Sequence, residues 1–168
     1  MNPQLFTKYL DDIARPTTTL IKMAPADRLS WVPGPQNFMT LGQLLHHLAG
    51  CPALFPLAVR DAMPAPEEMP RIIQEDLKNT AKPDQALWVL QENLRQAKEA
   101  VGAVSERDWD ARMVRLPWGK PTPLSRVSED LAGHWLNHKM QLFFYLKMLG
   151  YPVNTMTLYM GEAPAAKA

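Results

Sequence analysis

Apolar residues recur every three or four positions in four separate segments of the chain, a spacing typical of helices that bury one face. These segments cover residues 3–23, 40–63, 83–104 and 125–149. No long stretch alternates apolar and polar residues with a period of two, so a large sheet is not expected. Four long helices in 168 residues predict an all-α protein with the architecture of a four-helix bundle and short irregular segments between the helices.

Local signals mark several helix boundaries. Thr40, followed three residues later by Gln43, forms a capping-box pattern and is the expected N-cap of the second helix. Pro83 suits the first turn of the third helix, and Gly150 is a natural stop for the fourth. Pro16 predicts a kink or a restart within the first helix, and two further prolines predict bending of the second.

The connecting segments are less regular. Residues 64–82 are expected to be irregular, with a short helix over the stretch RIIQEDLKN. A loop follows the third helix, with a short hairpin near Trp118 and Gly119. The small and polar residues from about 161 onward predict a disordered tail on a single domain spanning 1–168.

Composition and charge exclude several classes of function. The 18 basic and 17 acidic residues give a formal net charge of +1, so neither nucleic acid nor a membrane surface is an expected partner. No apolar stretch has the length of a membrane helix or the form of a signal peptide. Cys51 is the one cysteine, which excludes an intramolecular disulfide. We therefore expect a cytoplasmic protein.

The four histidines of the chain carry the strongest chemical signal. His134 and His138 both fall within about 60° of the apolar stripe on a helical wheel of the last helix. The spacing of four places both rings one turn apart, where they can reach the same metal ion. The alternative is a pair of partly buried polar side chains without a metal. The glutamate of the HExxH protease motif is absent.

A third nitrogen ligand would come from the second helix. His47 lies nearer the apolar side of that helix than His46, which is better explained as a surface residue. Cys51 follows His47 by one turn and is either a fourth ligand or a buried apolar side chain, and the second interpretation is favoured.

Three other residues of the last helix are candidates for a second shell of contacts or for a pocket. Asp130 is either a partner of the ligands or a charge that favours the helix N-terminus, with the helix-charge interpretation preferred. Gln141 and Tyr145 lie on the histidine face, although a tyrosine at such a position more often belongs to the core.

Two stretches resemble the DinB/YfiT-like family of metal-dependent four-helix bundles. They are RLSWVPGPQNFMTLGQLLHHLAG, a Trp- and Pro-rich loop leading into a helix, and GHWLNHKMQLFFYLKMLGYPV in the last helix. Carried over to this chain, the family's three metal ligands fall on His47, His134 and His138. The chain departs from the family pattern at Asn137, where a further histidine is common. It also departs at Lys139 and Met140, the two residues before Gln141, where the family often has Arg-Gly.

This resemblance implies a divalent metal, with zinc and nickel favoured over iron and manganese. Three protein ligands leave a coordination position open to water or substrate, as in catalytic sites. The implied reactions on a small-molecule substrate are a transfer or isomerisation that uses a low-molecular-weight thiol, or a hydrolysis. The alternative is a metal-binding stress-response or interaction protein without turnover. The resemblance and the apolar run of residues 142–146 also predict a homodimer.

Overall fold

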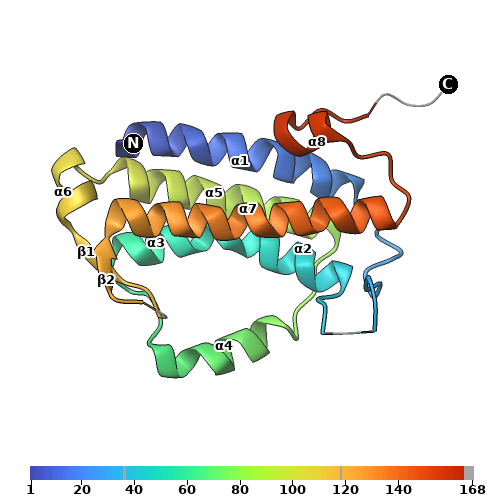
Figure 1. The fold of residues 1–168 in the computed structure, drawn as a ribbon, viewed down its shortest axis with the longest axis horizontal. Helices are drawn as coiled ribbons and strands as arrows, with labels where there is room; N and C mark the ends of the chain where they lie inside the picture. The colour runs from blue at the N-terminus through green and yellow to red at the C-terminus, as the bar shows by residue number, and fades with distance from the viewer. Residues whose placement is uncertain (36, 118, 165–168) are drawn as a thin grey trace.

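Helices make up most of the computed structural model, which describes residues 1–35, 37–117 and 119–164. The predicted predominantly α class is confirmed (Figure 1). The elements in chain order are α1 (Pro3–Met23), α2 (Leu41–Gly50), the 3-10 helix η1 (Cys51–Ala53), α3 (Leu54–Val59), the 3-10 helix η2 (Pro66–Glu68), α4 (Met69–Asp76), α5 (Pro83–Gly102), α6 (Glu106–Ala111), β1 (Met113–Arg115), β2 (Pro121–Pro123), α7 (Leu124–Met148) and α8 (Thr155–Met160).

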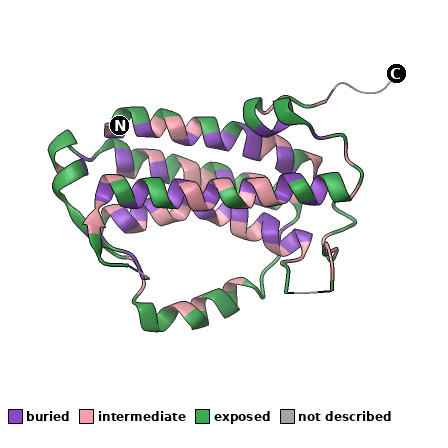
Figure 2. Cartoon of the chain, in the orientation of Figure 1, coloured by how far each residue is buried: buried purple, intermediate pink, exposed green. Residues whose placement is uncertain are grey.

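Four helical segments lie side by side along the long axis of the molecule. They are α1, α5, α7 and the composite segment α2–η1–α3, and Figure 1 shows their axes running in nearly the same direction. α1 packs against α5 and α7, and both α2 and α3 pack against these same two helices. The buried residues lie mainly along these four segments, as their colouring shows (Figure 2).

The first and last long helices match the sequence prediction closely. In α1, Asn2 caps the N-terminus by accepting the Leu5 amide, and the helix continues through Pro16 without restarting. α7 ends at Met148, and Gly150 follows with a left-handed φ of +83°. A glycine adopts this conformation without the steric cost that a side chain would add, which explains why α7 ends there.

The second segment is shorter and more broken than predicted. The predicted capping box is present, because Thr40 Oγ1 accepts from the Gln43 amide and Gln43 Oε1 accepts from the Thr40 amide. The α-helix stops at Gly50, however, and continues as η1 and α3 only to Val59. Pro52 lacks the amide hydrogen that a regular α-helix needs at this point, which accounts for the break.

The short elements are only partly foreseen by the sequence. The predicted short helix corresponds to α4, and the predicted hairpin corresponds to β1 and β2, which pair antiparallel. Trp118, named in that prediction, lies outside the described residues. The helices α6 and α8 are not predicted, although Ser105 and Asn154 cap them. Figure 1 shows α6 beside the hairpin at one end and α8 at the other.

α8 is held against the body of the protein by polar contacts with two long helices. Lys139 of α7 is buried, and its ammonium donates to the Leu158 carbonyl at 3.0 Å. The hydroxyl of Thr19 donates to the Gly161 carbonyl at 2.7 Å. The start of the predicted tail is thus in contact with α1, and residues 165–168 lie outside the described range.

The apolar run of residues 142–146 is mostly used inside the chain. Four of its five side chains are buried, and only Phe144 is exposed. The predicted homodimer therefore has less free apolar surface in this run than the sequence suggests. Within the described part of the chain, no helix is long and apolar enough to cross a membrane.

Replacing Gly161 by alanine is expected to loosen α8 more than the matched change at Gly150. Both glycines have positive φ, but a Cβ at Gly161 would lie 3.0 Å from backbone atoms of Arg15 and Pro16, whereas a Cβ at Gly150 meets nothing within 4 Å. Gly150→Ala should cost about 1–2 kcal/mol of backbone strain. Gly161→Ala should lower the free energy of unfolding, measured with urea, by more than this. It should also speed proteolysis near α8. Equal costs would show that the close approach is unimportant.

Candidate metal centre

Three imidazole rings meet between α2 and α7. The ring centroid of His47, from α2, lies 5.3 Å from that of His134 and 4.4 Å from that of His138. The centroids of His134 and His138, one turn apart on α7, are separated by 4.5 Å. All three histidines are half-buried, so solvent still reaches part of each side chain. The structure thus brings together the three histidines that the sequence singles out.

The nitrogen atoms of two of these rings are spaced as metal ligands. His47 Nε2 lies 3.1 Å from His134 Nε2. Two nitrogen ligands on one tetrahedral zinc ion, each about 2.0–2.1 Å from the metal, are about 3.3 Å apart. The pair therefore fits a shared divalent ion with little movement of either ring.

Asp76, the last residue of α4, orients His47 from the opposite side. Its Oδ2 lies 2.7 Å from His47 Nδ1. Because a carboxylate only accepts hydrogen bonds, His47 Nδ1 is the donor, and Nε2 is the ring nitrogen that faces His134. This hydrogen bond is the largest influence on the Asp76 carboxyl and holds its pKa below the ordinary value. A carboxylate behind a ligand histidine is common in metal sites.

Asp76 is the residue of the candidate site that the sequence does not reveal. No residue of α4 is buried, and Figure 2 shows α4 with mostly exposed side chains. Asp76 also lies 3.3 Å from His46 Nε2, so His46 faces the carboxylate rather than the pair on α7. Gln43 adds a hydrogen bond to the Leu77 carbonyl. The sequence predicts only a short helix in this region, which does not say what its polar residues face.

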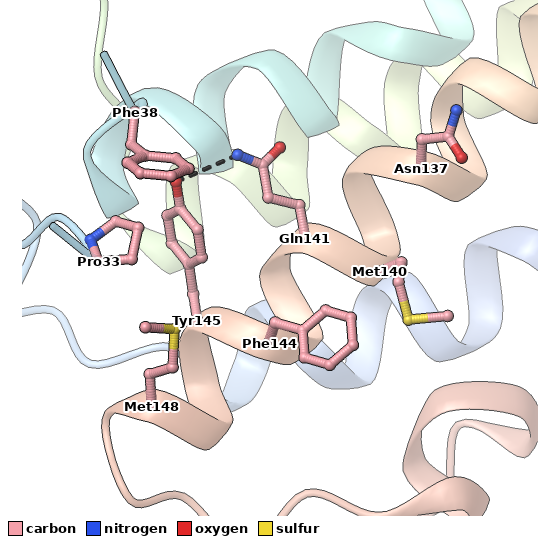
Figure 3. A pocket seen from close by; sticks show the side chains of 8 residues that line it. All are labelled: Pro33, Phe38, Asn137, Met140, Gln141, Phe144, Tyr145 and Met148. Carbon is pink, nitrogen blue, oxygen red and sulfur yellow. Dashed lines mark hydrogen bonds between the residues drawn. The ribbon is translucent and has the colours of Figure 1, made fainter. Parts of the chain in front are cut away.

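His138 is held by a chain of hydrogen bonds that runs along α7. Its Nδ1 lies 3.0 Å from Gln141 Oε1, and because an amide oxygen only accepts, Nδ1 is the donor and Nε2 stays free for a metal. The Gln141 amide donates to the Tyr145 hydroxyl at 3.1 Å, which donates to the Met39 carbonyl at 2.9 Å. Figure 3 shows the contact between Gln141 and Tyr145. Gln141 thus contacts a ring of the site, whereas Tyr145 is buried in the core and reaches His138 only through Gln141.

The other predicted neighbour, Asp130, lies elsewhere. Its side chain is exposed on α7 and its Oδ1 lies 3.5 Å from a guanidinium nitrogen of Arg126, one turn earlier. α7 begins at Leu124 and has no acidic residue in its first turn, so Asp130 is neither a partner of the histidines nor a charge at the helix N-terminus.

A thiol lies in the same cluster. The possible ligand atoms of His47, Cys51 and His134 all lie within 4.8 Å of one another. His138 does not belong to that group of donor atoms, although its ring is close to the other two. His138 is therefore next to the other two histidines by the position of its ring, whereas Cys51 is next to His47 and His134 by the position of its donor atom.

Burial keeps the two α7 imidazoles neutral near pH 7. Burial, followed by the charges of His138 and His47, lowers the pKa of His134 to about 4. Burial also lowers the pKa of His138, against the opposing effect of its hydrogen bond to Gln141. Neutral imidazoles are the form that binds metals, so both side chains are ready to act as ligands without losing a proton.

Replacing Asp76 by alanine is expected to weaken zinc binding by about 10- to 100-fold, because His47 loses the partner that fixes its tautomer and orientation. Asp130→Ala is the matched control, since it removes a carboxylate from the face of α7 that pairs with Arg126. Competition titration of the full chain against a zinc chelator measures both affinities. Equal affinities for the two variants would contradict the role given to Asp76.

The metal-free protein is expected to lose stability as the pH falls from 6.5 toward 4. The pKa of His134 is lowered from 6.5 to about 4 in the folded chain. Between these values the unfolded chain binds a proton that the folded chain does not, so the free energy of unfolding rises with pH. The loss on acidification should be on the order of 2 kcal/mol after allowance for partial exposure. Urea unfolding of the wild type and of His134→Asn at several pH values measures this loss. If the free energy of unfolding falls equally with pH in both proteins, the role given to His134 is contradicted.

An apolar groove begins one side chain away from His138. It has a volume of about 440 Å³. Gln141 links the groove to the site, because its Oε1 lies 3.0 Å from His138 Nδ1. Its amide nitrogen points toward Tyr145, which also lines the groove (Figure 3). The groove is lined by Pro33, Phe38, Asn137, Met140, Gln141, Phe144, Tyr145 and Met148. This lining has no charged side chain, so the groove suits an apolar or neutral group.

Comparison of the chain with protein-family models gives no match, and comparison with curated proteins finds no similar sequence. The function of the site must therefore be inferred from its own geometry.

Proposed function

We propose that this protein is a DinB-like four-helix bundle that binds one divalent metal ion at His47, His134 and His138 and uses it in a reaction of a small molecule. The observation that carries the proposal is the convergence of the three rings, with centroids 4.4 to 5.3 Å apart. The side-by-side packing of four helical segments supports the bundle architecture. Zinc and nickel are the preferred ions because all three proposed donors are imidazoles.

The side chains around the rings support a site organised for binding. Asp76 and Gln141 each engage the Nδ1 atom of a histidine, so neither hydrogen bond uses the Nε2 atom of His47 or of His138. Partial burial of the rings limits the access of water. A bound divalent ion would supply Lewis acidity toward an oxygen or sulfur atom and lower the pKa of a bound water.

The groove favours an enzyme over a protein that only stores or senses metal. Its uncharged lining suits the apolar part of a small ester, amide or electrophile, and Gln141 and Asn137 offer amide groups to a neutral polar group. A low-molecular-weight thiol is the proposed co-substrate if the reaction is a transfer or isomerisation. If the reaction is a hydrolysis, water is the co-substrate instead.

The experiment that tests this function is an activity screen of the full chain in metal-loaded and metal-free form. Substrates should include small esters and amides, and electrophiles with and without added thiols. We expect turnover of at least one class that depends on metal and falls in Phe144→Ser, a groove variant. If no class is turned over while one ion is bound per chain, the alternative of a metal-binding protein without catalysis is supported instead.

We also propose a homodimer that covers the exposed face of α7. Phe144 and Met148 are more than half exposed, and both line the groove, so a partner seated there would enclose it. A monomer in light scattering at micromolar concentration would count against this proposal.

A further inference from the structure

The sulfur of Cys51 is positioned to join the histidine nitrogens. Cys51 is the first residue of η1 and follows His47 by four positions, which places the two side chains one helical turn apart. Its Sγ belongs to the group of donor atoms, with those of His47 and His134, that lie within 4.8 Å of one another. A cysteine that served only to fill the core would not need to face two imidazoles.

The surroundings of the thiol leave its sulfur available. Cys51 is only 2% exposed, and its Sγ donates to the His47 carbonyl at 3.4 Å. This weak hydrogen bond uses the proton of the thiol and leaves the lone pairs of the sulfur free. Burial raises the pKa of the thiol, so the metal-free protein carries it in neutral form.

We propose that the Cys51 thiolate is a ligand of the metal ion together with the histidines, an inference that rests on the proposed metal site. As the metal–sulfur bond forms, the proton of the thiol passes to solvent, because coordination to a divalent ion stabilises the thiolate.

Charge balance supports this assignment. Three neutral imidazoles would leave a charge of +2 on a partly buried ion, which is unfavourable in a medium of low dielectric constant. The Cys51 thiolate removes one unit, and the Asp76 carboxylate, 2.7 Å from His47 Nδ1, offsets the other. The metal, the thiolate and the carboxylate then sum to zero.

A mixed nitrogen–sulfur set narrows the choice of metal. Thiolate donors favour zinc, cobalt or cadmium over manganese and magnesium. Four protein donors also fill the positions of a tetrahedral ion. A substrate would then have to bind as a fifth ligand, a coordination number that catalytic zinc sites can reach.

Loading the full, untagged chain with one equivalent of Co²⁺ tests the proposal. The wild type should show a thiolate-to-cobalt charge-transfer band in the near ultraviolet. X-ray absorption of the zinc form should show a sulfur atom at about 2.3 Å beside nitrogen atoms at about 2.0–2.1 Å. In Cys51→Ala both signals should vanish, the d–d bands of histidine-bound cobalt should remain, and zinc affinity should fall more than about 100-fold, beyond the usual effect of losing an indirect partner.

The outcomes separate this inference from the site it rests on. Binding of one Co²⁺ per wild-type chain without the charge-transfer band or the sulfur atom would overturn ligation by Cys51 and leave the histidine site intact. Binding of no metal by the wild type would overturn both. Circular dichroism of metal-free Cys51→Ala and Cys51→Ser identifies a folding defect, and the wild-type spectra decide the question even if both variants fail to fold.

Discussion

Replacing His134 by alanine is expected to abolish stoichiometric metal binding while leaving the helices formed. His134 Nε2 lies 3.1 Å from His47 Nε2, so its removal takes away one of the two nitrogens already spaced for a shared ion. Zinc affinity should fall by more than about 100-fold, because losing a direct ligand costs more than losing a residue that supports one. Calorimetric titration of the metal-free protein measures the loss, and circular dichroism checks the helices.

The matched control for this experiment is His46→Ala. His46 neighbours His47 in sequence but faces Asp76, at 3.3 Å, rather than the rings of α7. This variant should still bind one ion per chain. If instead His46→Ala loses the ion and His134→Ala keeps it, the assignment of ligands is wrong.

Replacing Phe6 by alanine is expected to cost about 3–5 kcal/mol of unfolding free energy, a large part of the total stability of a domain this size. Phe6 is fully buried, and its ring contacts those of Phe55 and Trp109 with centroid distances of 5.8 and 5.2 Å. These contacts join α1, α3 and α6 at the hairpin end of the molecule (Figure 1). Alanine would leave a cavity between three elements that are held in place by other contacts.

The control is Leu5→Ala, because Leu5 is the preceding residue of the same helix and is 52% exposed. It should change stability by no more than about 0.5 kcal/mol. Urea unfolding followed by circular dichroism measures both variants. A loss below 1 kcal/mol for Phe6→Ala would contradict the packing described for this end of the protein. Metal binding at saturating zinc should remain at one ion per folded chain.

The long helices could be predicted because their causes are local. The 3.6-residue period gives α1 and α7 almost to the residue, and the capping box at Thr40 and the left-handed Gly150 mark boundaries through contacts within a few positions. The sequence predicts a bend near Pro52, but periodicity does not show that the α-helix stops there. Apolar spacing continues across the break, since both α2 and α3 bury the same side.

The inward histidines could also be predicted, because the face of a helix follows from its sequence. The residues that those rings contact could not be predicted. Asp76 reaches His47 only through the path of the chain between α3 and α5, a path that no local pattern encodes. Lys139 is buried because α8 folds back over it, and the sequence does not reveal α8. The sequence favours Cys51 as an apolar core residue, because its helical position does not give the distance to a ring on another helix.

The most direct test of the central claim is the metal content of the full chain purified without an affinity tag, measured by elemental analysis before and after dialysis against zinc. The site predicts about one divalent ion per chain in the wild type and almost none in a variant that combines His47→Ala with His134→Ala. A wild-type protein that is folded and holds no metal, either as purified or after exposure to zinc, would contradict the account.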